Sequence, residues 1–189
     1  VNNHAFAEDD GNYWHLERRP HPDNLAVSWG KLLSERLRAS FYCDAESASS
    51  NDRIMRTTKN WIASNEKNLY RTIIILQWST WEREEWRIDN KYYQVNASGV
   101  DVVPESYQQQ YKEYVANVNW QEKTEQAHLK IWNFHLWLKS RNIQHVFFNG
   151  NNDFSKISNK QDWGVNYINP YDPAGTYHRV LNKKYDTVS

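Results

Sequence analysis

The chain has 189 residues, and its 23 Lys and Arg balance 23 Asp and Glu, so the formal net charge at pH 7 is zero. A balanced charge argues against nucleic-acid binding, because such a chain has no net field that attracts phosphates. No run of about 18 apolar residues occurs, so we expect no membrane-spanning segment. The lone cysteine, Cys43, excludes an internal disulfide. The length allows one domain or two very small ones, and we expect one domain over residues 1–189, of the α/β class that the order of its elements indicates below.

Aromatic residues are unusually common, with 10 Trp, 12 Tyr and 6 Phe, although the mean hydropathy is only −0.94. A low index is typical of disordered chains, but those have few aromatic residues and a high net charge. Each buried aromatic ring removes about 150–250 Å² from water. We therefore expect a core built largely from aromatic rings. The alternative is a surface on which aromatic faces stack against sugars.

The spacing of apolar residues predicts helices and strands in alternation. In chain order the expected elements are a helix at 25–39, a strand at 41–43, a helix from about 52, a strand at 72–77, a helical region after Pro104, a helix at 121–140, a strand at 145–148 and a short helix near 177–183. Asn24 or Ser28 is expected to cap the first helix, and Asn51 or Asp52 the second. Between 86 and 103 we expect irregular chain or a hairpin with its turn at 96–99.

The strand at 72–77 gives the strongest signal. Its core, Ile73–Leu76, is continuously apolar rather than alternating, which is typical of a parallel strand covered on both faces by helices. The helix at 121–140 carries apolar residues on two faces, so burial on more than one side is expected. Together these elements predict an α/β fold with a mainly parallel sheet.

Ligands of parallel α/β sheets bind beyond the carboxyl ends of the strands, and that rule selects three polar loops. The first two contain the residues that we predict to bind a ligand: Ser50, Asn51, Ser79, Thr80 and Arg83. In the third loop, 149–153, amides and glycine are more typical of turns and helix caps. Turns and caps are also an alternative interpretation of the first two loops. The charge run at 82–87 is typical of a solvated face.

Several stretches resemble the SGNH (GDSL-type) hydrolases, in particular the divergent members carried by marine bacteriophages. The similar stretches are Ser28–Leu33, Ala45–Ser50, Asn51–Ile54 with Arg56–Thr58, and Ile73–Arg83. The resemblance implies a three-layer, flavodoxin-like α/β/α fold. It implies an esterase or deacetylase acting on acylated sugars or lipids, in which a serine attacks, a glycine and an asparagine complete the oxyanion hole, and an Asp-x-x-His supplies the base.

The chain departs from that family pattern at several positions. Ala48 and Ser49 stand where the family has glycine, and the stretch 77–80 lacks the family's asparagine. No Gly-Asp-Ser strand precedes residue 25, and no Asp-x-x-His follows residue 180. The catalytic residues are therefore not assigned from the sequence. Two interpretations stay open: a fragment that lacks the first strand and the C-terminal motif, or a relative that kept the fold without the triad.

Other candidates for chemistry are weaker. His128 and His135 lie seven residues apart on one predicted helix, whereas helical metal ligands more often lie four apart. No cofactor motif is present, so we expect neither a cofactor nor a metal. The expected partners are a carbohydrate or acyl-ester ligand, or proteins of a virion, with no nucleic acid and no membrane. A non-catalytic virion component or glycan-binding protein is the alternative function, and the expected location is the host cytoplasm or the virion.

Overall fold

A computed structural model describes residues 22–46, 48–97, 99 and 102–185. The chain divides into two compact units, Val1–Ser49 and Ser50–Ser189. None of the helices in the described residues is long and apolar enough to cross a membrane.

In the first unit the predicted helix at 25–39 is divided into α2, Pro22–Ala26, and α3, Trp29–Arg36. Ser28 caps α3, because its Oγ accepts a hydrogen bond from the Lys31 amide at 3.3 Å. The Ser28 cap is thus confirmed. The predicted strand at 41–43 is wrong: none of the described residues pairs with this segment, and a strand needs such a ladder.

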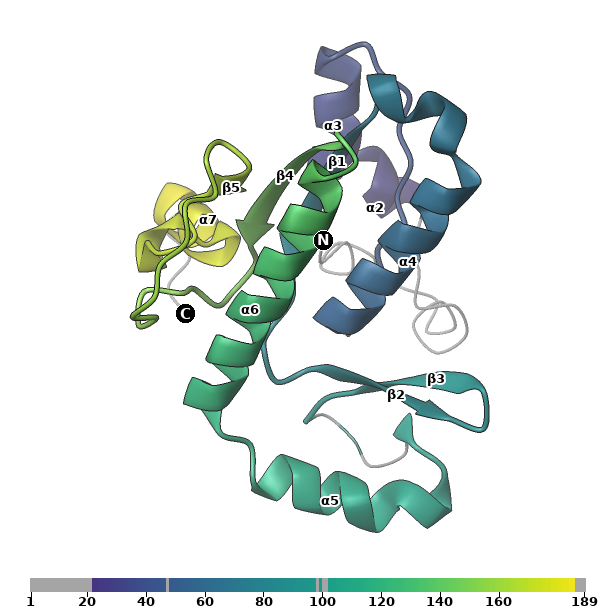
Figure 1. Ribbon diagram of the computed structural model, residues 1–189, viewed down its shortest axis with the longest axis vertical. Coiled ribbons are helices and arrows are strands. Elements are labelled where there is room, and N and C mark those ends of the chain that lie inside the picture. Colours follow the sequence, from purple (N-terminus) through teal and green to yellow (C-terminus); the bar gives the residue numbers. More distant parts are fainter. Residues whose placement is uncertain (1–21, 47, 98, 100–101, 186–189) are drawn as a thin grey trace. The chain divides into compact units, whose positions relative to one another are not determined.

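The second unit contains a parallel sheet of three strands in the order β1-β4-β5. These strands are Ile73–Trp78, Gln144–Asn149 and Tyr167–Ile168. β1 and β4 pair from Ile73 opposite Gln144 to Trp78 opposite Asn149. The predicted parallel α/β arrangement and its two main strands are confirmed, whereas β5 lies in a stretch predicted to be irregular (Figure 1).

The helices of the second unit are α4, Asn51–Ser64; α5, Gln108–Ala116; α6, Trp120–Lys139; and α7, Tyr177–Tyr185. Short 3-10 turns are η1, Glu66–Arg71; η3, Glu105–Tyr107; and η4, Pro173–Gly175. The cap of α4 is Ser50 rather than Asn51 or Asp52, because the Ser50 Oγ accepts from the Arg53 amide at 3.2 Å.

A β-hairpin follows β1, with β2 at Glu84–Ile88 and β3 at Lys91–Val95. Its turn is at Asp89 and Asn90, whose φ angles are 46° and 62°, and not at 96–99 as predicted. Asp and Asn tolerate this left-handed conformation, which a two-residue hairpin loop requires. The hairpin and α5 share a small core of Ile88, Val95, Val103 and Tyr111.

The main core lies between the parallel sheet and its helices, and it is rich in aromatic rings. Trp78 of β1 contacts Phe134 and Phe147 edge-on, at centroid distances of 6.2 and 5.0 Å. The predicted aromatic core is therefore confirmed. The second apolar face predicted for α6 is only partly buried: Trp132 packs against the core, but Leu129 and Leu136 are 59% and 43% exposed.

Neighbouring side chains of β4 meet different helices. Phe147 contacts Phe134 of α6, and Phe148 contacts Tyr177 of α7. Since successive strand residues point to opposite faces, these contacts place α6 and α7 on different faces of β4.

Candidate functional site

The structure brings the two predicted ligand loops together at the carboxyl end of β1. The Asn51 side chain accepts a hydrogen bond from the Ser79 amide at 2.8 Å and donates to the Ser79 carbonyl at 3.3 Å. These two bonds join the first turn of α4 to the residue that follows β1. The Asn51 amide is therefore used within the fold and positions Ser79.

The three remaining predicted residues have different partners. Arg83 donates from Nη1 to the Ser79 Oγ at 3.0 Å, and Thr80 donates to the Glu82 carboxylate at 2.8 Å. Ser50 is completely buried as the cap of α4. All five predicted residues thus lie in one region, and their role toward a ligand stays a prediction.

A buried polar network fixes the hairpin against α4. The Ser50 amide donates to the Gln94 side chain, which donates in turn to Glu85 at 2.7 Å. Glu85 also accepts two hydrogen bonds from Arg56, each 2.7 Å long. The prediction of a solvated face at 82–87 is wrong for Glu85, whose side chain is only 5% exposed.

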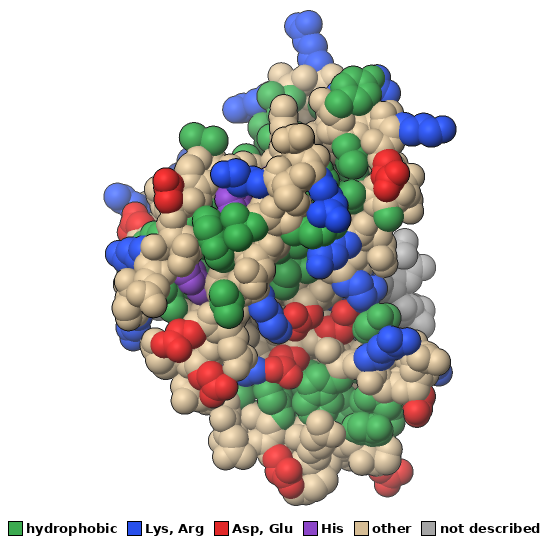
Figure 2. All heavy atoms as spheres, viewed as in Figure 1, with side chains coloured by type: hydrophobic (Ala, Val, Ile, Leu, Met, Phe, Trp, Pro, Cys, Tyr) green, Lys and Arg blue, Asp and Glu red, His purple; other side chains and the backbone are tan. Residues whose placement is uncertain are grey.

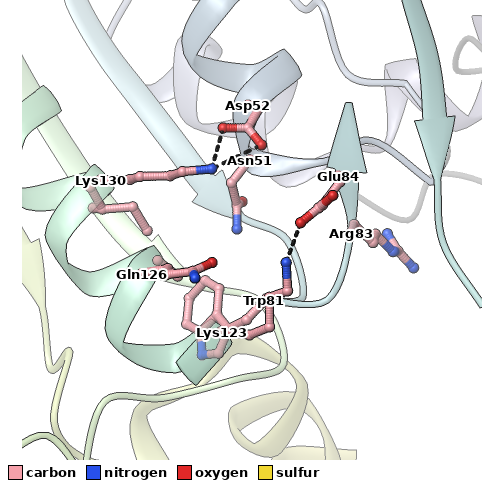
Figure 3. A pocket seen from close by; sticks show the side chains of 10 residues that line it. Asn51, Asp52, Trp81, Arg83, Glu84, Lys123, Gln126 and Lys130 are labelled. Carbon is pink, nitrogen blue, oxygen red and sulfur yellow. Dashed lines mark hydrogen bonds and ion pairs between the residues drawn. The ribbon is translucent and has the colours of Figure 1, made fainter. Parts of the chain in front are cut away.

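Beside these loops lies a hollow of about 340 Å³, including its space open to solvent, between α4, α6 and the start of β2. Two ion pairs line it: Asp52 with Lys130 at 2.9 Å, and Glu84 with Lys123 (Figure 3). Acidic and basic side chains alternate in this part of the surface (Figure 2). Each lysine in the lining is therefore neutralised by a carboxylate.

Arg83 is oriented differently from the neighbouring Glu84. Figure 3 shows Glu84 turned toward Lys123, while the Arg83 guanidinium points to the other side. This divergence follows from their positions, since successive residues of an extended chain point to opposite faces. Arg83 forms no ion pair with any of the described residues.

Unpartnered polar atoms gather where β1 and β4 end. Ten buried side-chain atoms have no hydrogen-bond partner among the described residues, and six of them belong to these segments: Gln77 Oε1, Trp78 Nε1, Trp81 Nε1, Glu82 Oε2, Arg83 Nε and Asn152 Oδ1. Most buried polar groups in folded proteins are hydrogen-bonded, so this concentration is unusual. A polar ligand is one way to satisfy such atoms. Trp81 lies in the loop after the strongest predicted strand, but it was not among the residues predicted to bind a ligand.

The third loop packs against β1 through its backbone. The Gly150 amide donates to the Trp78 carbonyl at 3.0 Å, and a Cβ at position 150 would lie 2.8 Å from that oxygen. The His178 amide donates to the Gly150 carbonyl. The loop therefore has the structural role that its amides and glycine predict.

The histidines of α6 lie in the aromatic core, where His128 packs against Phe154, a ring that also stacks on Trp81. His128 contacts the Tyr171 hydroxyl at 3.0 Å, and His135 contacts His145 at 2.9 Å. Within the described residues no group of three or more His, Cys, Asp or Glu side chains is placed to hold a metal ion. No hydrogen bond joins a described histidine to Ser50, Ser79 or Thr80.

Comparisons with known proteins were made over the whole chain. Neither a curated protein nor a solved structure matches it. A family model does match over residues 19–177, which include α4, β1, the hairpin, α6 and β4. The chain therefore belongs to DUF6071, a family of unknown function.

Proposed function

We propose that this chain is a hydrolase of the SGNH type that cleaves acyl esters of sugars and binds its substrate at the carboxyl end of β1. One observation carries the proposal: the two hydrogen bonds between Asn51 and Ser79 join the very loops on which the resemblance rests. Parallel α/β sheets bind their ligands at this edge.

The three-layer, flavodoxin-like arrangement is part of this proposal. Three parallel strands in the order β1-β4-β5 support it, as do the contacts of β4 with α6 on one face and α7 on the other. The Ala48 backbone gives local support. Its φ of 60° lies in the region that glycine favours, and the family has glycine in this loop.

The proposed reaction proceeds in two steps. A serine oxygen attacks the acyl carbonyl, its proton passes to a base, and the sugar hydroxyl leaves with a proton. Water then cleaves the acyl-enzyme, releases the carboxylic acid and regenerates the serine. Ser79 and Arg83 bind and orient the sugar in this scheme, Asn51 positions Ser79 through its backbone, and no described residue is assigned as the nucleophile.

A glycan-binding function without catalysis is the second candidate. It is favoured by the hydroxyls of Ser79 and Thr80, which are held by Arg83 and Glu82. Hydroxyls fixed in this way are suited to orienting a polar ligand.

The test combines acetate release with active-site labelling. The purified chain is incubated with acetylated glucose and xylose, and a fluorophosphonate probe followed by mass spectrometry locates any reactive serine. We expect acetate release and one labelled serine. Sugar binding without release or labelling would support the second candidate and contradict the hydrolase.

A further inference from the structure

We propose that Ser79 and Arg83 together bind a carboxylate, so that the ligand at the end of β1 is an acidic sugar of the hexuronic acid class. This inference rests on the proposed function, which supplies the sugar. It adds the group by which the sugar is recognised.

The hydrogen bond between the two side chains leaves only donors available to a ligand. Arginine has no acceptor, so Arg83 donates and the Ser79 Oγ accepts in their 3.0 Å contact. The Ser79 O–H then keeps its proton for another acceptor. The Arg83 Nε–H is buried and has no acceptor among the described residues. The Ser79 O–H and the Arg83 Nε–H, which have no acceptor among the described residues, are therefore suited to a ligand that accepts hydrogen bonds.

The charges around Arg83 indicate that this acceptor is an anion. Three acidic residues adjoin it in the chain: Glu84 is paired with Lys123 and Glu85 with Arg56, while Glu82 accepts a hydrogen bond from Thr80 and pairs with no described cation. Within the part of the chain that the structure describes, no carboxylate lies within ion-pair distance of Arg83. A half-buried guanidinium without a counter-charge attracts a negatively charged ligand.

Shape and charge favour a carboxylate over a phosphate. A guanidinium edge presents parallel N–H groups that match the two oxygens of a carboxylate. A phosphate monoester carries a charge of about −1.5 to −2 at pH 7 and so needs more than one free cation. The lysines of the neighbouring hollow are already paired with Asp52 and Glu84. A single guanidinium that has no counter-charge among the described residues therefore suits a singly charged ligand.

The direct test is isothermal titration calorimetry of the intact chain with methyl glucuronide, methyl glucoside and glucose 6-phosphate. We expect methyl glucuronide to bind at least about tenfold more tightly than either of the other two, as for hydrogen bonds to a charged group. Equal affinity for the neutral glucoside would overturn the inference. Equal or tighter binding of the phosphate ester would also overturn it, because the site would then recognise anions in general.

Matched variants assign the preference to these residues. Arg83→Gln removes the charge, and Ser79→Ala removes the hydroxyl donor. We expect the first to abolish the preference for glucuronide and the second to reduce it severalfold. The control is Arg87→Gln, which removes an exposed arginine four residues away that contacts Asn90 and the Tyr92 ring. Unchanged preference in Arg83→Gln, with a native circular dichroism spectrum, would contradict the assignment.

Two outcomes distinguish the carboxylate site from the hydrolase activity. If acetate is released equally from acetylated glucose and acetylated glucuronate, the hydrolase proposal holds and the carboxylate site is refuted. If glucuronide binds selectively but no acetyl ester is cleaved, the carboxylate site holds and the hydrolase is refuted.

Discussion

Acidification should destabilise the fold through His135, a completely buried side chain of α6. The His145 Nδ1 lies 2.8 Å from the Ile143 carbonyl and must carry the proton that this bond requires. The His145 Nε2 then accepts from the Nδ1–H of His135 at 2.9 Å. The His135 Nε2 keeps a bare lone pair, with no donor among the described residues. Both rings are therefore neutral in this arrangement.

The expected loss of folding stability on acidification follows from the pKa of His135. Burial, and then the nearby charges of His145 and Lys139, lower this pKa from 6.5 to about 4. Because the folded pKa is depressed, the unfolded chain binds the proton first as the pH falls. The stability contribution is complete above about pH 6.5 and is lost progressively down to about pH 4. At about 1.4 kcal/mol per pKa unit, the loss between pH 8 and pH 5 is ~2 kcal/mol.

The assay is urea unfolding of the wild type and of His135→Phe at pH 8 and pH 5. The variant leaves the His145 Nε2 without its donor and is expected to be less stable at both values, by about 1–3 kcal/mol at pH 8. Its loss of stability on acidification should be smaller than that of the wild type by ~2 kcal/mol. The control His178→Gln removes an exposed imidazole of α7 and should keep the wild-type pH dependence. Equal pH dependence in His135→Phe and the wild type would refute the reasoning.

Three further changes test how the site is built, each by urea unfolding. Asn51→Ala removes both hydrogen bonds to the Ser79 backbone and should lower the free energy of unfolding by about 1–3 kcal/mol. Hydrogen exchange of the Ser79 amide should become faster, and unchanged exchange would contradict the role of Asn51. Glu85→Gln breaks the bidentate ion pair with Arg56 of α4 and should lower the free energy of unfolding by about 3 kcal/mol. A decrease below about 1 kcal/mol would mean that the pair is effectively solvated. Gly150→Ala places a Cβ 2.8 Å from the Trp78 carbonyl oxygen and should lower the free energy of unfolding by about 1–3 kcal/mol. An unchanged free energy of unfolding would show that the loop can move away.

The parts of the fold with strong local signals were predictable from the sequence. The continuous apolar run of β1 and the long periodic helix α6 were expected within one or two residues of their bounds. The segment 41–43 has strand-like residues, but no described strand pairs with it, and propensity alone does not supply a partner. The hairpin turn was misplaced because the turn-forming residues at 96–99 were chosen, whereas the left-handed backbone of Asp89 and Asn90 makes the turn.

The candidate site was predictable only in its location. The rule for parallel sheets correctly selected Ser79, which follows β1, whereas it selected Asn51 through a strand near 41–43 that the structure does not contain. The two residues are nevertheless joined by hydrogen bonds. The ion pairs were not predictable, because the partners of Glu84 and Glu85 lie 39 and 29 residues away in the chain. Their position depends on how α4, the hairpin and α6 pack, which residue spacing does not reveal.

The site at the end of β1 is tested most directly by nuclear magnetic resonance of the ¹⁵N-labelled chain during titration with acetylated methyl glucuronide. The indole N–H of Trp81 has no described hydrogen-bond partner, and Trp81 follows Thr80 in the loop that carries Ser79 and Arg83. We expect saturable shifts that are largest for this indole and for the amides of residues 79–83. Saturable shifts that are largest elsewhere, or no shifts at all, would contradict a ligand site at the carboxyl end of β1.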